Sequence, residues 1–214
     1  MLPEQQLPDP LPEEPMTLLA AWLEEAIRRK DRPNPNAMVL ATAVDGRPSA
    51  RVVLCKDIDV TSGTVRFYTN YLSRKGRELA ANPHAALVFH WDHLHRQVRL
   101  EGKVEKASAA DSDNYFATRP RESQVGAHAS RQSEPIESMQ ALDASTEAVR
   151  ARFGSGPIPR PPHWGGFVFW AEAVELWVAG AARLHERARW EREVALSCGA
   201  RPVAGPWKGT RLQP

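Results

Sequence analysis

The sequence predicts an α+β protein in which an antiparallel β-barrel carries peripheral helices. Short β-rich segments, separated by turn residues such as Asp45-Gly46, fill much of the chain between residues 38 and 106. A second group of such segments begins at residue 166, and helical patterns are inserted between the strands. Strands with helices inserted between them in this way are typical of a barrel in the α+β class.

The composition indicates one globular domain with a polar N-terminal arm. The 214 residues are 42% hydrophobic, and the net charge of +2 gives no argument for nucleic-acid binding. Residues 1–14 combine prolines with acids and carry no base, so we expect a flexible arm there and a single domain over residues 15–214. Neither a charged-then-apolar leader nor a run of about 18 apolar residues is present, which predicts a soluble, cytoplasmic protein.

The period of the apolar residues and the positions of proline and glycine predict the individual elements. The predicted helices are residues 15–30, 73–81, 108–118 and 139–153. The predicted strands are residues 38–44, 49–56, 64–70, 85–91, 97–106, 166–170, 174–178, 183–190 and 208–212. Alternation is clearest over residues 97–106, where Val98, Leu100 and Val104 share one face, and this face should be core. Residues 194–206 are expected to form a loop.

Four potential cations recur with a period of two over residues 183–190. They are Arg183, His185, Arg187 and Arg189. In a strand they would project from one face, where like charges repel one another unless an anion lies among them. Guanidinium groups match phosphate oxygens in pairs, so the segment favours a phosphate ligand. The alternative is a solvated edge strand whose charges only discourage aggregation.

Two further clusters suit a phosphate. Residues 73–75 (Ser-Arg-Lys) open a predicted helix, where free backbone N–H groups and the helix dipole favour an anion. Tyr115 and Arg119 share a face of the next predicted helix, and Ser123 follows just beyond its end. The alternatives are an exposed basic turn in the first case and a surface arginine in the second.

Other chemistries lack the residues they require. His90, His93 and His95 fall near a predicted turn, and no cysteine or acid completes a ligand set, so no metal site is expected. Cys55 and Cys198 lie far apart, and Cys55 is expected to be a buried structural thiol. The hydrolase elbow, the P-loop and the dinucleotide-binding glycine pattern are absent. The basic clusters therefore predict phosphate-bearing small molecules, most economically a cofactor and a substrate.

Seven short motifs, in one order along the chain, resemble the pyridoxamine 5'-phosphate oxidase family. They are Ala50-Arg51-Val52-Val53-Leu54-Cys55-Lys56, Phe67-Tyr68-Thr69-Asn70 followed by Ser73-Arg74-Lys75, Arg96-Gln97-Val98, Tyr115-Phe116 to Arg119-Pro120, Arg131-Gln132-Ser133, His163-Trp164-Gly165-Gly166, and Arg183-Leu184-His185 with Arg187. The resemblance covers nearly all of residues 15–214. It implies an FMN-binding split β-barrel that works as a homodimer, with the flavin at the subunit interface.

The resemblance also implies which residues contact each ligand. The FMN contacts would be Arg51, Val52, Val53, Leu54, Cys55, Lys56, Tyr68, Thr69, Arg74, Lys75, Gln97, Gln132, Ser133, Trp177 and Arg187. The substrate contacts would be Lys56, Tyr115, Arg119, Ser123, Arg183, Leu184 and His185. Arg74 and Lys75 would hold the FMN phosphate, while Arg183 and His185 would be the catalytic residues that close over the pyridine ring. No metal is implied.

The implied reaction oxidises pyridoxamine 5'-phosphate or pyridoxine 5'-phosphate to pyridoxal 5'-phosphate, with O2 reduced to H2O2. Besides the second subunit, the expected partners are small molecules, without nucleic acid or membrane. Two alternatives stay open: a related flavin oxidase of the phenazine-biosynthesis type, and a non-catalytic binder of flavin or pyridoxal phosphate. The chain departs from the family at Val178, usually Gln, and at Glu186, commonly Asp. Its N-terminal arm also lacks the basic-aromatic segment that covers substrate in some members.

Overall fold

The computed structural model of the chain describes residues 6–195 and 202–214. The chain divides into two compact units. Unit 1 comprises the described residues of Met1–Phe67, His84–Val104 and Phe169–Pro214, and unit 2 comprises Tyr68–Pro83 and Glu105–Val168. The expected division into an arm of residues 1–14 and one domain of residues 15–214 stays a prediction.

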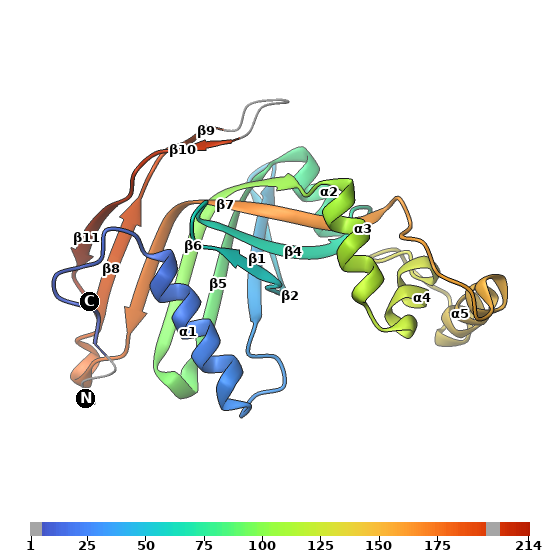
Figure 1. The fold of residues 1–214 in the computed structure, drawn as a ribbon, viewed down its shortest axis with the longest axis horizontal. Helices are drawn as coiled ribbons and strands as arrows, with labels where there is room; N and C mark the ends of the chain where they lie inside the picture. Colours follow the sequence, from blue (N-terminus) through green and yellow to red (C-terminus); the bar gives the residue numbers. More distant parts are fainter. Residues whose placement is uncertain (1–5, 196–201) are drawn as a thin grey trace. The chain divides into compact units, whose positions relative to one another are not determined.

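Figure 1 shows the helices and strands in chain order. The helices are α1 (Met16–Arg29), α2 (Arg74–Ala81), α3 (Ala109–Thr118), α4 (Arg121–Ala129) and α5 (Met139–Phe153). The strands are β1 (Ala37–Val44), β2 (Arg47–Leu54), β3 (Asp57–Asp59), β4 (Thr64–Asn70), β5 (His84–Trp91), β6 (Arg96–Lys106), β7 (Trp164–Val178), β8 (Glu186–Glu191), β9 (Val194–Ala195), β10 (Val203–Ala204) and β11 (Lys208–Leu212). Two short 3₁₀ turns, η2 (Asp92–Leu94) and η3 (Ala181–Arg183), precede β6 and β8.

The main sheet is antiparallel and confirms the predicted α+β class. Its strands follow the order β11-β8-β7-β6-β5-β1-β2, while β4 pairs with both β3 and β7. The ladders that join β1 to β2, β5 to β6, and β7 to β8 are all antiparallel. On β6, Val98 and Leu100 are 0% exposed and Val104 is 5% exposed, so the face predicted to be core is buried.

The core of unit 1 lies between the sheet and α1. Met38 and Leu40 on β1 are 1% and 0% exposed, and α1 buries Trp22 against the same core. Arg96 at the start of β6 is also buried, and its charge is balanced locally. Its guanidinium carbon lies 4.9 Å from the centroid of the Trp22 ring, and Nη1 donates to Glu25 Oε2 at 2.5 Å. This pair ties α1 to the sheet.

The described residues that precede α1 pack on the C-terminal strands of unit 1. Leu7 is 4% exposed, and its N–H donates to Glu186 Oε2 at 2.9 Å. Trp190 Nε1 on β8 donates to the carbonyl of Pro12 at 2.8 Å. Apolar burial and backbone hydrogen bonds thus hold this polar, proline-rich segment, although its composition alone gives no sign of either.

Several elements differ from those predicted. Residues 183–190 begin a strand only at Glu186, because the chain first turns through η3. Residues 166–170 and 174–178 are parts of one long strand, β7, and α4 was not predicted. In the expected loop of residues 194–206, β9 and β10 pair with each other, while residues 196–201 lie outside the described part of the chain.

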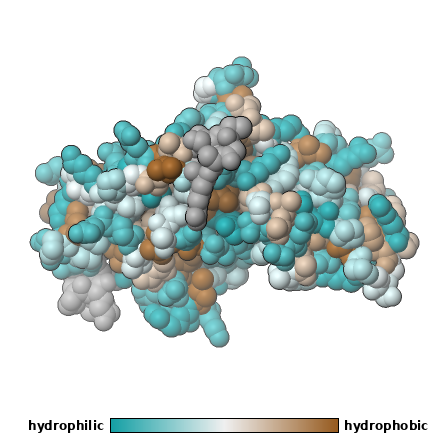
Figure 2. Space-filling view, turned by 45° about the horizontal axis from the view of Figure 1, so that its top comes forward, coloured by the Kyte–Doolittle hydropathy of each residue, from teal (hydrophilic) through white to brown (hydrophobic). Residues whose placement is uncertain are grey.

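The surface mixes polar and apolar side chains. Hydrophilic residues predominate on the face drawn in Figure 2, and hydrophobic residues form small groups among them. Two exposed valines are cross-strand partners: Val39 on β1 is 37% exposed, and Val52 on β2 is 64% exposed. Over residues 6–195 and 202–214, no helix combines the length and the apolar content needed to cross a membrane.

Candidate functional site

A lysine, two hydroxyl groups and an amide meet beside the N-terminus of α2 in unit 2. Lys75 Nζ donates to Thr69 Oγ1 at 3.0 Å, to Ser73 Oγ at 3.2 Å and to Gln132 Oε1 at 2.9 Å. Thr69 Oγ1 also donates to Gln132 Oε1 at 3.2 Å. All these oxygens are neutral, so these three bonds orient the ammonium group through uncharged acceptors. We call Thr69, Ser73, Lys75 and Gln132 the lysine cluster.

Ser73 gives α2 its start at this place. Its backbone is extended, and its Oγ accepts a hydrogen bond from Gly76 N at 3.3 Å, as in a standard N-cap. The partial positive charge of the helix N-terminus adds to the charge of Lys75. Arg74, by contrast, has a side chain that is 64% exposed and donates to Glu78 Oε1 at 2.8 Å. Of the two predicted phosphate ligands, the lysine is the one within the cluster.

Three aromatic rings of unit 2 lie nearly parallel. The ring centroids of Tyr68 and Tyr115 are 3.9 Å apart with an interplanar angle of 18°. The Trp164 ring is 5.6 Å from Tyr68 and 6.2 Å from Tyr115. Gly166 leaves room for the stack, since a Cβ there would lie 2.9 Å from Tyr68 Cε1. The stack joins a predicted FMN contact, Tyr68, to a predicted substrate contact, Tyr115.

Arg119 lies over the same aromatic group. Its guanidinium carbon is 4.5 Å from the Trp164 ring centroid and 5.6 Å from that of Phe116. Burial lowers the pKa of Arg119, and the neighbouring Tyr115 acts in the opposite direction. Its Nη1 is buried and has no hydrogen-bond partner within the described ranges. A desolvated, unpaired guanidinium nitrogen is the kind of donor that an anionic ligand satisfies.

Two predicted serines lie in turns of unit 2. Ser123 falls in the first turn of α4, where its N–H donates to the carbonyl of Pro120 at 2.8 Å. Ser133 follows Gln132 with a φ of 74°, a left-handed conformation that residues other than glycine rarely adopt. Backbone strain of this kind concentrates at functional sites.

In unit 1, several of the predicted FMN contacts lie along β2. Arg51 Nη1 donates to Thr42 Oγ1 at 2.6 Å and to the carbonyl of Leu40 at 3.3 Å. Val52 points outward at 64% exposure, whereas Val53 is 9% exposed. The strand therefore alternates between core and surface, and Arg51 is held by the neighbouring strand β1.

The remaining predicted contacts near β2 and β6 have different surroundings. Leu54 is the last residue of β2, and the N–H of Lys56 donates to the carbonyl of Arg66 at 2.9 Å. Cys55 is 3% exposed, and burial raises the pKa of its thiol to about 12, which confirms the expected buried thiol. Gln97 is half-buried on β6.

The predicted catalytic pair lies in the turn between β7 and β8. The rings of Trp177 and His185 have centroids 4.6 Å apart and are tilted by 40°. Gly180 N donates to His185 Nδ1 at 3.2 Å, so a neutral His185 carries its proton on Nε2. Arg183 and Leu184 are exposed, and Arg183 has a φ of 64°. The side chains predicted to touch the pyridine ring are therefore on an irregular turn.

A buried carboxylate holds Arg187. Its Nε and Nη2 donate to Glu175 Oε1 at 3.0 and 2.9 Å, and its Nη1 donates to the carbonyl of Gln213 at 3.1 Å. Glu175 is only 4% exposed. Glu175 was not among the residues predicted from the sequence. The sequence did contain a signal for this pair, because an acid lies on β7 and arginines lie on β8, the strand that pairs with β7.

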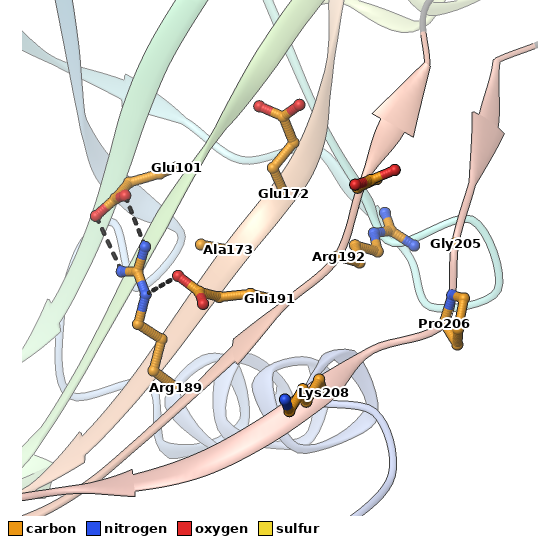
Figure 3. A pocket seen from close by; sticks show the side chains of 10 residues that line it. Glu101, Glu172, Ala173, Arg189, Glu191, Arg192, Gly205, Pro206 and Lys208 are labelled. Carbon is orange, nitrogen blue, oxygen red and sulfur yellow. Dashed lines mark hydrogen bonds and ion pairs between the residues drawn. The ribbon is translucent and has the colours of Figure 1, made fainter.

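The other arginine of β8 lines a pocket of about 600 Å³ in unit 1 (Figure 3). Arg189 Nη2 donates to Glu101 Oε2 at 2.9 Å, and Nε donates to Glu191 Oε1 at 2.8 Å. The hydrogen bonds with Glu101 raise the pKa of Arg189 and lower that of the glutamate. The expectation that residues 183–190 present four cations to one anion is wrong, because the strand starts at Glu186 and acids pair with both of its arginines.

The fold and these side chains define a class of protein. An antiparallel barrel-type sheet combines with a lysine cluster at a helix N-terminus and with an arginine whose buried Nη1 has no partner among the described residues. This combination is typical of proteins that bind phosphorylated small molecules. In the part of the chain that the structure describes, no three His, Cys, Asp or Glu side chains are grouped so that they could hold a metal ion.

Comparisons with known proteins agree with this class. The family described as "Pyridoxamine 5'-phosphate oxidase" matches residues 23–153, and the "Pyridoxine 5'-phosphate oxidase C-terminal dimerisation region" matches residues 164–214. A pyridoxine/pyridoxamine 5'-phosphate oxidase from Gluconobacter oxydans is 49% identical, over 94% of this chain and 94% of its own length. The protein of the same name from Burkholderia vietnamiensis is 48% identical, over 94% of this chain and 89% of its own length.

Two solved structures are similar as well. PhzG from Burkholderia lata, in complex with tetrahydrophenazine-1-carboxylic acid, has a TM-score of 0.85 at 34% identity and covers 100% of this chain and 98% of its own. A pyridoxamine 5'-phosphate oxidase-related, FMN binding protein from Nostoc punctiforme has a TM-score of 0.70 at 15% identity, over 94% of this chain and 97% of its own. The latter shows similarity of fold alone.

The chain belongs to the pyridoxamine 5'-phosphate oxidase family. This membership confirms the predicted family and the split-barrel fold, and the protein is an oxidoreductase with FMN as its cofactor. The lysine cluster fits the phosphate end of FMN, because it combines a cation, hydroxyl groups and a helix N-terminus. The assignments of individual residues to FMN and substrate stay predictions.

Proposed function

We propose that this enzyme oxidises pyridoxine 5'-phosphate and pyridoxamine 5'-phosphate to pyridoxal 5'-phosphate, with O2 as the final electron acceptor. The observation that carries the proposal is Arg119, whose buried Nη1 has no partner among the described residues. A phosphate ester would satisfy this nitrogen, with the Tyr115 and Ser123 hydroxyl groups as further donors. The relatives at 48–49% identity carry the name of this activity, which supports the same reading.

When bound, FMN would supply the redox chemistry, a two-electron oxidation at the 4'-carbon, in which two electrons and two protons leave the substrate and reduce O2 to H2O2. With the amine substrate, water would then replace the nitrogen, which leaves as ammonia. The residues of the chain would bind FMN and the substrate and orient them toward each other. Lys75 would hold the FMN phosphate, and Arg119 would hold the substrate phosphate. Each ligand would therefore be fixed by its phosphate group. Orientation of this kind can contribute roughly 7 to 11 kcal/mol in ideal cases. His185, with a proton on Nε2, would donate to the substrate ring.

The test compares phosphorylated with unphosphorylated substrate under air. We expect kcat/KM for pyridoxine 5'-phosphate to exceed that for pyridoxine by roughly 100-fold or more, because the charged phosphate contacts are lost with the alcohol. Equal values would contradict the role of Arg119 and favour the phenazine-type alternative. If neither compound causes oxygen uptake, the result would favour the other alternative, a non-catalytic binder.

Replacing Arg183 with alanine is expected to lower kcat by roughly 10- to 100-fold, the range for a lost charged contact, while the protein keeps its FMN. Arg183 is exposed on η3, so its removal should leave the fold intact. Stopped-flow reduction and the flavin absorbance measure the two effects separately. Arg28→Ala, at a position on α1 that is also exposed, is the control and should alter neither. A colourless Arg183→Ala protein that regains full activity on addition of FMN would contradict this division of roles.

We further propose that two copies of the chain form the working enzyme. The outward face of β1, β2 and β5 supports a dimer, because it aligns Val39 with Val52 and Val88, and Ala41 with Ala50. The match of residues 164–214 to a dimerisation region supports it independently. The substrates and FMN carry phosphate charges that do not cross membranes unaided, so we also propose that the enzyme acts in the cytoplasm, where such compounds are retained.

The substitution Val39→Asp is expected to convert the dimer to a monomer, since an unpaired carboxylate in an apolar interface costs several kcal/mol. Light scattering after size exclusion measures the mass, and circular dichroism checks the fold. Ile27→Asp changes another β-branched apolar residue, which lies on α1 and is 49% exposed, and serves as the matched control. A folded Val39→Asp dimer would contradict the assignment of this sheet face to the interface.

A further inference from the structure

We propose that Trp164 is a positioning residue that holds Arg119 ready for the substrate phosphate without cancelling its charge. The inference rests on the proposed function and adds a residue to it. Trp164 is the shared neighbour of three predicted ligand contacts. Its ring centroid lies 5.6 Å from that of Tyr68, 6.2 Å from that of Tyr115 and 4.5 Å from the Arg119 guanidinium carbon.

This protein holds two of its predicted ligand-binding arginines in different ways. Arg187 donates twice to the buried carboxylate of Glu175, which compensates its charge. Arg119 lies instead against the faces of Trp164 and Phe116. An aromatic face attracts a cation through its quadrupole but carries no net charge. The full charge of Arg119 therefore stays available, and its buried Nη1 needs a partner from outside the described chain.

A carboxylate close in sequence to this site is already paired. Asp113, two residues before Tyr115 on α3, accepts from Arg160 Nε at 2.6 Å. Arg160 Nη1 also donates to the carbonyl of Trp164 at 2.7 Å. The same arginine thus pairs with this acid and fixes the backbone that carries the indole.

Trp164 is well placed to act as a rigid support. It is 6% exposed and belongs to a core cluster with Phe116, Val125 and Ile158. Close packing restricts its rotamer, so the ring can fix the plane of the guanidinium. An arginine held in one plane loses less conformational entropy when it binds both oxygens of a phosphate.

The test measures binding of pyridoxal 5'-phosphate and of pyridoxal to the FMN-loaded enzyme by titration calorimetry, with KM for pyridoxine 5'-phosphate alongside. Trp164→Leu removes the ring, and we expect Kd for pyridoxal 5'-phosphate to rise about 10-fold with Kd for pyridoxal unchanged, as loss of a desolvated cation–π contact predicts. Trp164→Phe keeps an aromatic ring that attracts a cation more weakly, and it should raise Kd for pyridoxal 5'-phosphate about threefold. Val125→Ala disturbs the same core cluster without touching Arg119, and should leave the ratio of the two Kd values unchanged.

Two results would overturn the inference: wild-type affinity of Trp164→Leu for pyridoxal 5'-phosphate, or an equal loss of affinity for both ligands. If the leucine variant does not fold, Trp164→Phe decides the matter, and an unchanged ratio of Kd values in that variant counts against the positioning role. Failure of the wild-type enzyme to oxidise pyridoxine 5'-phosphate would instead refute the proposed function. An active wild type with an unaffected Trp164→Leu variant would refute the positioning role alone.

Discussion

Replacing Arg119 with alanine is expected to raise KM for pyridoxine 5'-phosphate by roughly 10- to 100-fold, because a hydrogen bond to a charged group contributes about 1.5–3 kcal/mol. The FMN content should not change, since Arg119 is neither of the two predicted flavin phosphate contacts, Arg74 and Lys75. The fold should also survive, because Arg119 Nη1 bonds to no other described residue. Steady-state kinetics and the flavin-to-protein absorbance ratio measure the two properties.

Arg152→Ala is a matched control for this substitution. The Arg152 guanidinium carbon lies 5.0 Å from the centroid of the Phe153 ring, so it too stacks on an aromatic residue, but it is exposed on α5 and has no predicted ligand. We expect wild-type kinetics from this variant. An Arg119→Ala enzyme with unchanged KM, or one that loses FMN instead, would contradict the assignment of Arg119 to the substrate phosphate.

Replacing Lys75 with alanine is expected to weaken FMN binding by roughly 100-fold, since it removes the cation at the centre of the lysine cluster and the charged hydrogen bonds that it can give. The protein should purify with little colour and regain activity at high FMN concentration. Quenching of FMN fluorescence during titration gives the dissociation constant. Lys30→Ala removes the same charge from an exposed position after α1 and should bind FMN normally. Wild-type FMN affinity in Lys75→Ala would show that the phosphate is held elsewhere.

Local patterns in the sequence predicted much of the scaffold. The alternation of Val98, Leu100 and Val104 identified the core face of β6, because a strand points successive side chains to opposite sides. The position of Ser73 before a helical pattern identified the start of α2, because a serine hydroxyl can cap free N–H groups. The spacing of Tyr115 and Arg119 predicted that the two share one face of a helix. That prediction is wrong in part, because α3 ends at Thr118 and Arg119 has an extended backbone.

Long-range contacts could not be predicted in this way. The aromatic support of Arg119 depends on Trp164, which lies far along the chain on β7, and no periodic pattern relates the two. The pairing of Arg187 with Glu175 required the register of the β7–β8 hairpin. The regular alternation of residues 183–190 was misleading, because Ala182 and Arg183 adopt positive φ angles of 52° and 64° and delay the strand.

The most direct measurement is the visible spectrum of the purified protein, followed at once by an aerobic assay with pyridoxine 5'-phosphate. The proposed function predicts a yellow protein with flavin absorbance bands that forms pyridoxal 5'-phosphate and H2O2 in equal amounts. A yellow protein that produces neither compound would contradict the proposed reaction but would still support the flavin site. A colourless protein that FMN cannot reconstitute would contradict the flavin site itself.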